Sequence, residues 1–140
     1  MSAVLWPYKL HNGTVSSSEE DLYFLYSHTQ ALDEICLSEG LPAFSELQDF
    51  TDMMFNMEEL ELPEGDEDTT GLMISQGTWV EPSQALATMR GLKSYLSTND
   101  DMSPIPSDDL KGLLEELAEG IKVSEEAEIE GAKFNLSVIM

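Results

Sequence analysis

The feature that most constrains the fold is the alternation of apolar and polar residues at the end of the sequence. Between Lys133 and Ile139 the two kinds of residue alternate, and a period of two is typical of a β-strand with one buried face. We expect the buried set to be Phe134, Leu136 and Val138. An isolated strand is not stable in water, so the rest of the chain must supply strands that pair with it.

A second strand is predicted at the N-terminus. Residues 3–10 are rich in β-forming residues, and the His-Asn-Gly sequence at 11–13 indicates a turn after them. Pro7 should place this strand at a sheet edge or force a bulge, because proline has no amide hydrogen to donate. Two strands alone are marginal, so we expect a third near residues 72–80, where Leu72, Met73 and Ile74 follow one another.

Three stretches between these strands show the three- and four-residue apolar spacing of amphipathic helices. The first should begin at a capping box of Ser17 and Glu20 and end at Gly40. The second should begin at Pro82 and the third at an N-cap serine, Ser107. From their apolar faces we expect the core to include Leu32, Leu92, Leu113 and Leu117.

The remaining segments are less regular. Residues 45–50 are predicted to form a short helical piece, which is followed by irregular structure. Residues 62–71 are predicted to form a solvated loop, and residues 99–106 a linker. The whole chain, 1–140, is therefore interpreted as a single α+β domain. Its small antiparallel or mixed sheet should include both terminal strands and be covered by about three helices.

The charge of the chain limits its partners. Aspartate and glutamate total 28 against six lysines and arginines, which gives a net charge of −22. Nucleic acids and anionic membranes bind proteins through basic residues, so we expect neither direct nucleic-acid binding nor membrane binding. A strongly negative field attracts basic partners. The alternative interpretation is that the acidic surface serves only solubility.

The sequence predicts a cytoplasmic protein. Cys36 is the only cysteine, which excludes an intramolecular disulfide. Residues 1–10 lack the continuous apolar run of a signal peptide, and no stretch approaches the roughly 18 apolar residues of a membrane span.

No catalytic residue, cofactor site or metal ligand is predicted. The loop Asp66 to Gly71 resembles the start of a calcium loop, but the twelfth position is Gly77 instead of the bidentate glutamate. We therefore expect no calcium-dependent change in stability. His28 and Cys36, eight residues apart on one predicted helix, lie about 12 Å apart along its axis, too far for a nucleophile and its base.

One sequence pattern resembles a known group of proteins. Trp79, Pro82, Leu86, Thr88, Leu92 and Leu96 follow the pattern W-x-x-P-x-x-x-L-x-T-x-x-x-L-x-x-x-L, and the chain ends with the run Gly-Ala-Lys-Phe-Asn-Leu-Ser-Val at 131–138. Together they are similar to small acidic bacterial proteins that have no assigned activity. The similarity covers about the C-terminal half of the chain well and the first predicted helix loosely. It implies a bacterial α+β domain and no catalytic residues.

These observations favour a non-enzymatic interaction protein, such as an immunity or inhibitor protein that neutralises a basic toxin or nuclease. A phage or plasmid mimic of nucleic acid is a variant of this hypothesis. The alternative is an enzyme or small-ligand-binding domain whose pocket is built from dispersed residues.

The predicted contact lies mainly in the acidic segment, Glu46 to Asp68, which contains no lysine or arginine. Its apolar side chains supply anchors and its acids supply charge. Trp79 is either a further anchor or a side chain packed beneath a helix start. The candidate contact residues are Asp49, Phe50, Asp52, Met53, Met54, Phe55, Glu58, Glu59 and Trp79.

Overall fold

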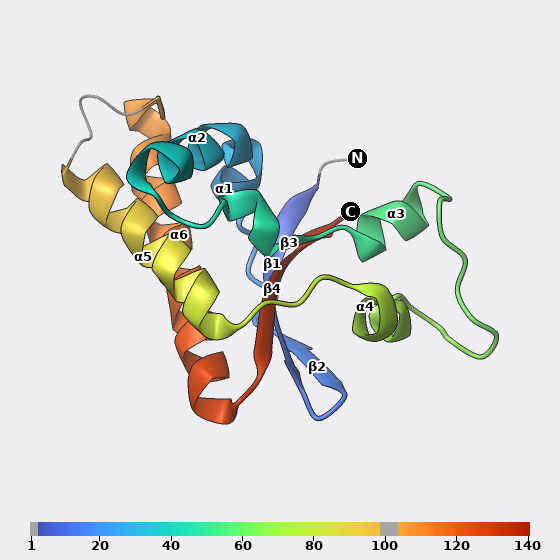
Figure 1. Ribbon diagram of the computed structural model, residues 1–140. Helices are drawn as coiled ribbons and strands as arrows, with labels where there is room; N and C mark the ends of the chain where they lie inside the picture. The colour runs from blue at the N-terminus through green and yellow to red at the C-terminus, as the bar shows by residue number, and fades with distance from the viewer. Residues whose placement is uncertain (1–2, 99–103) are drawn as a thin grey trace.

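The computed structural model describes residues 3–98 and 104–140. Its centre is a four-stranded mixed sheet with the order β2-β1-β4-β3 (Figure 1). Both terminal strands are in it, as predicted, and they pair with each other in antiparallel register from the pair of Val4 and Ile139 to the pair of Leu10 and Lys133. The strands are β1 (Val4–His11), β2 (Thr14–Ser17), β3 (Gln48–Asp49) and β4 (Lys133–Ile139).

The predicted turn at residues 11–13 closes a hairpin of β1 and β2. His11 pairs with Thr14, and Asn12 and Gly13 between them have φ values of 51° and 76°. Two residues in the left-handed region form the tight turn that matches the twist of paired strands. The prediction of a capping box at Ser17 is wrong. Ser17 belongs to β2, and its hydroxyl accepts a hydrogen bond from the backbone amide of Glu19.

Pro7 lies in an inner strand and not at a sheet edge, which corrects the expectation. It pairs with Leu136 of β4 on one side. On the other side β2 pairs only with residues 8–11 of β1, and the next bridge joins Leu5 to Leu22. Pro7 therefore lies in the gap between these two pairings, where its missing amide hydrogen interrupts no ladder.

One face of the sheet is covered by α1 (Tyr23–Ser27), α2 (Thr29–Glu39), α5 (Pro82–Thr98) and α6 (Ser107–Glu130). The single helix predicted before Gly40 is thus two helices. They separate at His28, where the hydroxyl of Thr29 lies 3.0 Å from the carbonyl oxygen of Leu25 and 2.9 Å from that of Tyr26. A hydroxyl that bonds these carbonyls competes with the helical hydrogen bonds. The predicted end at Gly40 is confirmed, in a left-handed conformation with φ 69°.

The starts of α5 and α6 are close to the predicted positions. Pro82 is the first residue of α5, as expected. In α6 the cap position is Pro106 and Ser107 is the first helical residue, so the predicted serine cap is wrong by one position. Asp108 and Asp109 occupy the first turn, where acids favour the positive end of the helix dipole. Of the predicted linker, residues 99–103 lie outside the described residues.

The middle of the chain differs most from the prediction. The helical piece near 45–50 is a 3₁₀ helix, η1 (Phe44–Leu47), and the residues expected to be irregular form α3 (Thr51–Asn56). The strand predicted at 72–74 is instead part of α4 (Thr70–Gln76). Near residues 72–80 only a single bridge, between Val80 and Phe134, joins the sheet. Three successive apolar residues have no period, so they did not distinguish a strand from a short helix.

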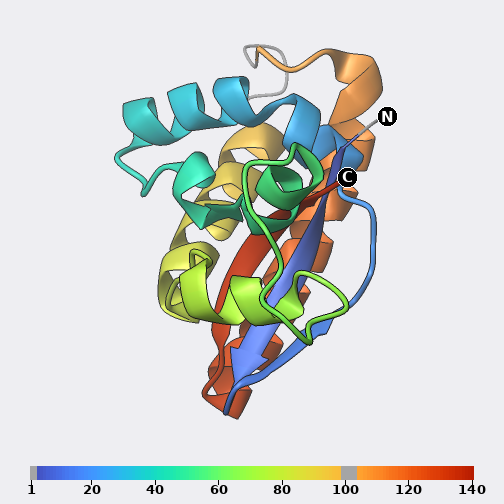
Figure 2. The same ribbon diagram turned by 90° about the vertical axis from the view of Figure 1, so that its right-hand side faces the viewer.

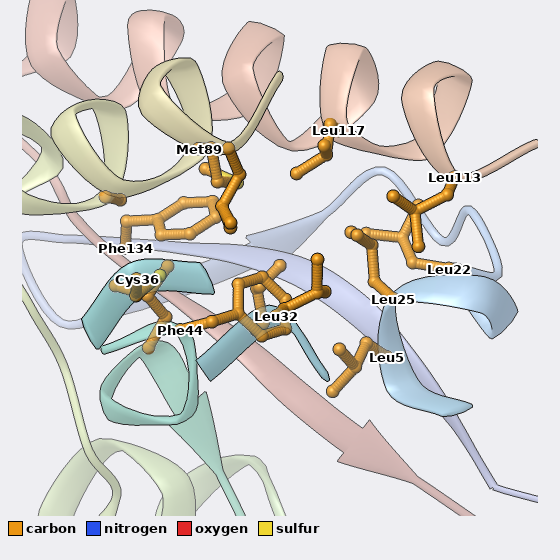
Figure 3. Packing of buried hydrophobic residues seen from close by; sticks show 14 of the residues in the cluster. Leu5, Leu22, Leu25, Leu32, Cys36, Phe44, Met89, Leu113, Leu117 and Phe134 are labelled. Carbon is orange, nitrogen blue, oxygen red and sulfur yellow. The ribbon is translucent and has the colours of Figure 1, made fainter. Parts of the chain in front are cut away.

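The core lies between the sheet and the helices of the first face. All four leucines predicted to be buried, Leu32, Leu92, Leu113 and Leu117, have no exposed surface. Figure 3 shows Met89, Leu113 and Leu117 pointing from α5 and α6 into the cluster that contains Phe134, Phe44 and Leu22.

The strand β4 is buried on both faces. Phe134, Leu136 and Val138 face the core, as predicted, but Asn135 and Ser137 on the opposite side are also fully buried. The helices α3 and α4 cover that second face (Figure 2). The alternation of apolar and polar residues in β4 therefore distinguishes an apolar buried face from a polar buried face. It does not distinguish a buried face from a solvent-exposed one.

Candidate functional site

The apolar side chains of the acidic segment gather on and beside α3, on the second face of the sheet. Met53 packs against the core, and Met54 and Phe55 are half-buried. At the two ends of the helix, Phe50 is 42% exposed and Met57 is 52% exposed. Large apolar side chains with this exposure are accessible to a partner without any rearrangement of the core.

The chain leaves α3 in a defined conformation. Glu58 has a φ of 63°, its amide donates to the carbonyl oxygen of Phe55, and the amide of Glu59 donates to that of Met54. These bonds satisfy carbonyls at the helix end and direct the following chain away from the sheet. The exposed acids of this stretch are Glu58, Glu59, Glu61, Glu64, Asp66, Glu67 and Asp68.

A groove of about 630 Å³ lies where this stretch turns back past the end of α3. Its walls combine apolar side chains, Phe55, Leu60 and Leu62, with the carboxylates of Glu58 and Glu61. A lining that combines apolar side chains with charges of one sign is suited to a side chain that carries both an apolar stem and a positive charge.

Two of the candidate contact residues have structural roles. Asp49 is only 2% exposed. Its carboxylate accepts the amide of Thr78 at 2.7 Å and both the amide and the hydroxyl of Thr51. These bonds connect β3, α3 and the chain after α4, so Asp49 is not available to a partner, contrary to the expectation.

Asp52 links further elements on the same face. Its carboxylate accepts the hydroxyl of Thr69 at 2.8 Å, the side-chain amide of Asn56 at 3.1 Å and the backbone amide of Met140 at 3.3 Å. It therefore holds the two ends of the exposed stretch, and the end of the chain, against α3.

Trp79 is half-buried, and its indole N–H donates to the carbonyl oxygen of Met73 at 2.9 Å. Met73 lies in α4 and its carbonyl oxygen also accepts a hydrogen bond from the amide of Gly77, so the indole adds a second hydrogen bond near the end of that helix. The alternative prediction is a side chain packed beneath the helix start at Pro82, whereas the hydrogen bond of Trp79 is to α4. This bond gives Trp79 a structural partner separate from the groove beside α3.

A second group of titratable side chains lies between α1, α2 and α6. Nε2 of His28 is 2.8 Å from Oδ2 of Asp109, and a carboxylate oxygen of Glu116 accepts the amide of Leu25 at 2.9 Å. Burial raises the pKa of Glu116, against the opposing effects of the backbone amides and of nearby His28. Sequence reasoning missed this group because its members come from helices that are distant in the chain.

Cys36 lies in the core, away from solvent. Burial raises the pKa of its thiol to about 11, and nearby Asp33 adds to the effect. A thiol with this pKa remains protonated at neutral pH and is a poor nucleophile, which supports a packing role for this residue.

The described residues contain no group of three or more histidine, cysteine, aspartate or glutamate side chains arranged to hold a metal ion. In the stretch that resembles a calcium loop, Thr70 and Gly71 belong to α4, and the carboxylate of Asp68 accepts the amide of Thr70 at 2.9 Å. Asp68, one of the acids in that stretch, therefore accepts a hydrogen bond from the first residue of α4.

No family model, curated protein or solved structure matches this chain. Within residues 3–98 and 104–140, none of the helices combines the length and apolar character that a membrane-spanning helix requires.

Proposed function

We propose that this protein binds a basic protein partner through the exposed part of its acidic segment, and that it acts as an inhibitor or immunity protein in the cytoplasm. The observation that carries the proposal is the groove beside α3, where Phe55, Leu60 and Leu62 lie among the carboxylates of Glu58 and Glu61. The acidic segment has no lysine or arginine that would compensate these charges.

The two components of this surface contribute differently to binding. Apolar side chains that become buried at an interface supply most of the affinity. Carboxylates around them increase the association rate by attracting a basic partner, and they select against acidic ones. The net charge of −22 extends the same field over the rest of the molecule.

The surface proposed to contact a partner contains only some of the candidate residues that were named from the sequence. It comprises the exposed or half-exposed Phe50, Met54, Phe55, Glu58 and Glu59, together with the groove residues Leu60 and Glu61. Asp49 and Asp52 hold the surface in place through the hydrogen bonds described above, and Trp79 supports α4. Substitution of those three residues would change the fold and would not test binding alone.

The test compares two variants of equal net charge. In the first, Glu58, Glu59, Glu61 and Glu64 are replaced by glutamine. In the second, four exposed acids elsewhere, Glu20, Glu34, Glu39 and Glu128, are replaced in the same way. A partner captured by immobilised wild-type protein is identified, and its association rate with each protein is measured between 0.05 and 1 M salt.

We expect the association rate with wild-type protein to fall steeply with salt, since the Debye length shrinks from about 10 Å at 0.1 M to about 3 Å at 1 M. The first variant should bind more slowly and with a weaker dependence on salt, whereas the second should remain close to wild type. Equal effects of the two variants would assign the acids a solubility role and refute the proposal.

A further inference from the structure

The few basic residues of this chain are not distributed evenly. Of six lysines and arginines in the sequence, Arg90 and Lys93 lie on α5, and Lys111 and Lys122 lie on α6. Four of the six therefore occur on one pair of packed helices. These helices cover the opposite face of the sheet from α3 and the exposed part of the acidic segment (Figure 1).

A groove of about 580 Å³ runs between α5 and α6 on their outer side. Leu110, Leu114 and Ala118 of α6 form its apolar part, with Lys93 and Lys111 beside them. Lys93 also borders an adjoining hollow of about 420 Å³, which contains Arg90 and Ile121. The two hollows share Lys93 and so lie next to each other, and we call them together the α5–α6 groove.

The apolar residues of the groove form a second stripe on α6, which lies beside its fully buried stripe and packs against the edge of the core. Leu110, Leu114, Ala118 and Ile121 follow one another at spacings of four, four and three residues, and so lie on one side of the helix. At 1.5 Å per residue the stripe is about 16 Å long, which corresponds to three turns of a docked helix. Leu110, Leu114 and Ile121 are only partly buried.

The charges beside this stripe are available to a partner. Arg90 forms an ion pair of 2.8 Å with Glu125, but Lys93, Lys111 and Lys122 are exposed and form no ion pair with an acid of the described residues. Glu115 is the one acid among the residues that line the two hollows. Among the side chains that line the two hollows, the cations Arg90, Lys93 and Lys111 therefore outnumber the single acid, although α6 as a whole is acidic.

We infer that the α5–α6 groove is a docking site for an acidic amphipathic helix of a partner protein. Such a helix would place apolar residues, repeating every three or four positions, on the Leu110–Ile121 stripe. Its flanking carboxylates would meet Lys93 and Lys111. A nucleic acid fits less well, because a phosphate backbone has no apolar face for the stripe and is repelled by the rest of the molecule.

This site is independent of the proposed function. It uses the opposite charge, other helices and the opposite face of the sheet (Figure 2). A protein with both surfaces is able to hold a basic and an acidic partner at the same time.

The experiment uses two synthetic helical peptides with leucine at alternating three- and four-residue spacing. One carries glutamate at the flanking positions and the other carries lysine. Each is titrated into the full-length protein while the methyl resonances of Leu110, Leu114 and Ile121 are followed by NMR. We expect the glutamate peptide to shift these methyl resonances, and the lysine peptide to shift resonances of the acidic segment instead.

Two double variants with the same net charge complete the test. Lys93→Gln with Lys111→Gln removes two cations of the groove, whereas Lys9→Gln with Lys133→Gln removes two cations paired with acids elsewhere. Removal of two exposed charge pairs should weaken binding of the glutamate peptide roughly 3- to 10-fold in the first variant, and the second should bind like wild type.

Three outcomes would overturn the inference. These are the absence of any shift of the groove methyl groups with the glutamate peptide, equal shifts of these groups with both peptides, and equal loss of binding in both double variants. Each would show that the groove does not select an acidic helix.

Discussion

The buried carboxylate of Asp49 and the partly buried carboxylate of Glu116 differ in how the fold compensates for their loss of contact with water. Asp49 accepts two backbone amides and one hydroxyl, which replace much of the water it loses. Glu116 is held by the amide of Leu25, and burial is the largest influence on its pKa, which is raised. The ionised form of Glu116 is therefore less favourable in the folded protein than in the unfolded chain.

This difference predicts a pH-dependent effect of Glu116→Gln. Because the pKa of Glu116 is higher in the folded state, the folded protein binds this proton more tightly, and ionisation costs stability as pH rises above the ordinary glutamate range. Glutamine keeps an acceptor for the Leu25 amide without the charge. The variant should have a higher melting temperature than wild type at neutral pH and the same one at low pH.

Thermal unfolding measured from acid to neutral pH checks this prediction, with the exposed neighbour Glu115→Gln as the control. His28 lies near Glu116, and a positive charge on His28 opposes the rise in the pKa of Glu116. The melting temperatures of wild type and Glu116→Gln should therefore be compared with that of the control at every pH. A melting temperature below wild type at neutral pH would indicate that the charge of Glu116 stabilises the fold.

Among the strands, β4 is buried on both of its faces, one apolar and one polar. Its core face packs against α5 and α6, and its polar face is covered by α3 and α4. On the polar face the side-chain amide of Asn135 donates to the carbonyl oxygen of Thr78 at 2.8 Å and accepts the hydroxyl of Ser137 at 2.8 Å. Buried polar groups of this kind are costly when they lose their partners.

We therefore predict that Asn135→Val destabilises the protein, although valine favours strands and is apolar. The change removes the donor to the Thr78 carbonyl and the acceptor of the buried Ser137 hydroxyl, which keeps only a weak contact with the sulfur of Met73, at a cost of about 1–3 kcal/mol. Urea unfolding measures the loss in free energy of unfolding. Thr14→Val, at an exposed position of β2, is the matched control and should change stability by less than about 0.5 kcal/mol. An unchanged or increased stability of Asn135→Val would mean that this face is open to solvent.

At the scale of the whole molecule, the basic residues are concentrated on one pair of helices, whereas the acids are spread over both sides, with nine of the 28 on α6 itself. The exposed acids of the acidic segment lie on the side of α3, and four of the six basic residues lie on α5 and α6. Only a few ion pairs join described residues, and those of Arg90 and Lys133 are largely exposed, where such pairs contribute little. Repulsion among the acids therefore outweighs attraction in the balance of −22.

This imbalance predicts that salt stabilises the fold. Between about 0.01 and 0.15 M sodium chloride the Debye length falls from roughly 30 to 8 Å, so repulsion across the molecule is screened. The melting temperature should rise over this range and change less above it. The variant with Glu20, Glu34, Glu39 and Glu128 replaced by glutamine should show a smaller rise. A melting temperature that falls with added salt would show that the exposed ion pairs dominate.

The sequence by itself determined those elements whose signal is local. The alternation of β4, the apolar spacing of α5 and α6, the turn at Asn12 and Gly13, and the end of α2 at Gly40 were all predicted correctly. Each depends on residues close together in the chain, because periodicity, proline and glycine act through the backbone of their own segment. The acidic segment was also found in this way, from the types of residue it contains.

Only the tertiary structure decided which of these elements meet. The second buried face of β4, the strand at Gln48 and Asp49, and the helix at residues 70–76 depend on contacts between segments far apart in the chain. The same is true of the structural role of Asp49 and of the pairing of His28 with Asp109. A local pattern predicts that one face of an element is buried or that a polar group is hydrogen-bonded. Which segment covers that face, or bonds that group, depends on the packing of the whole chain.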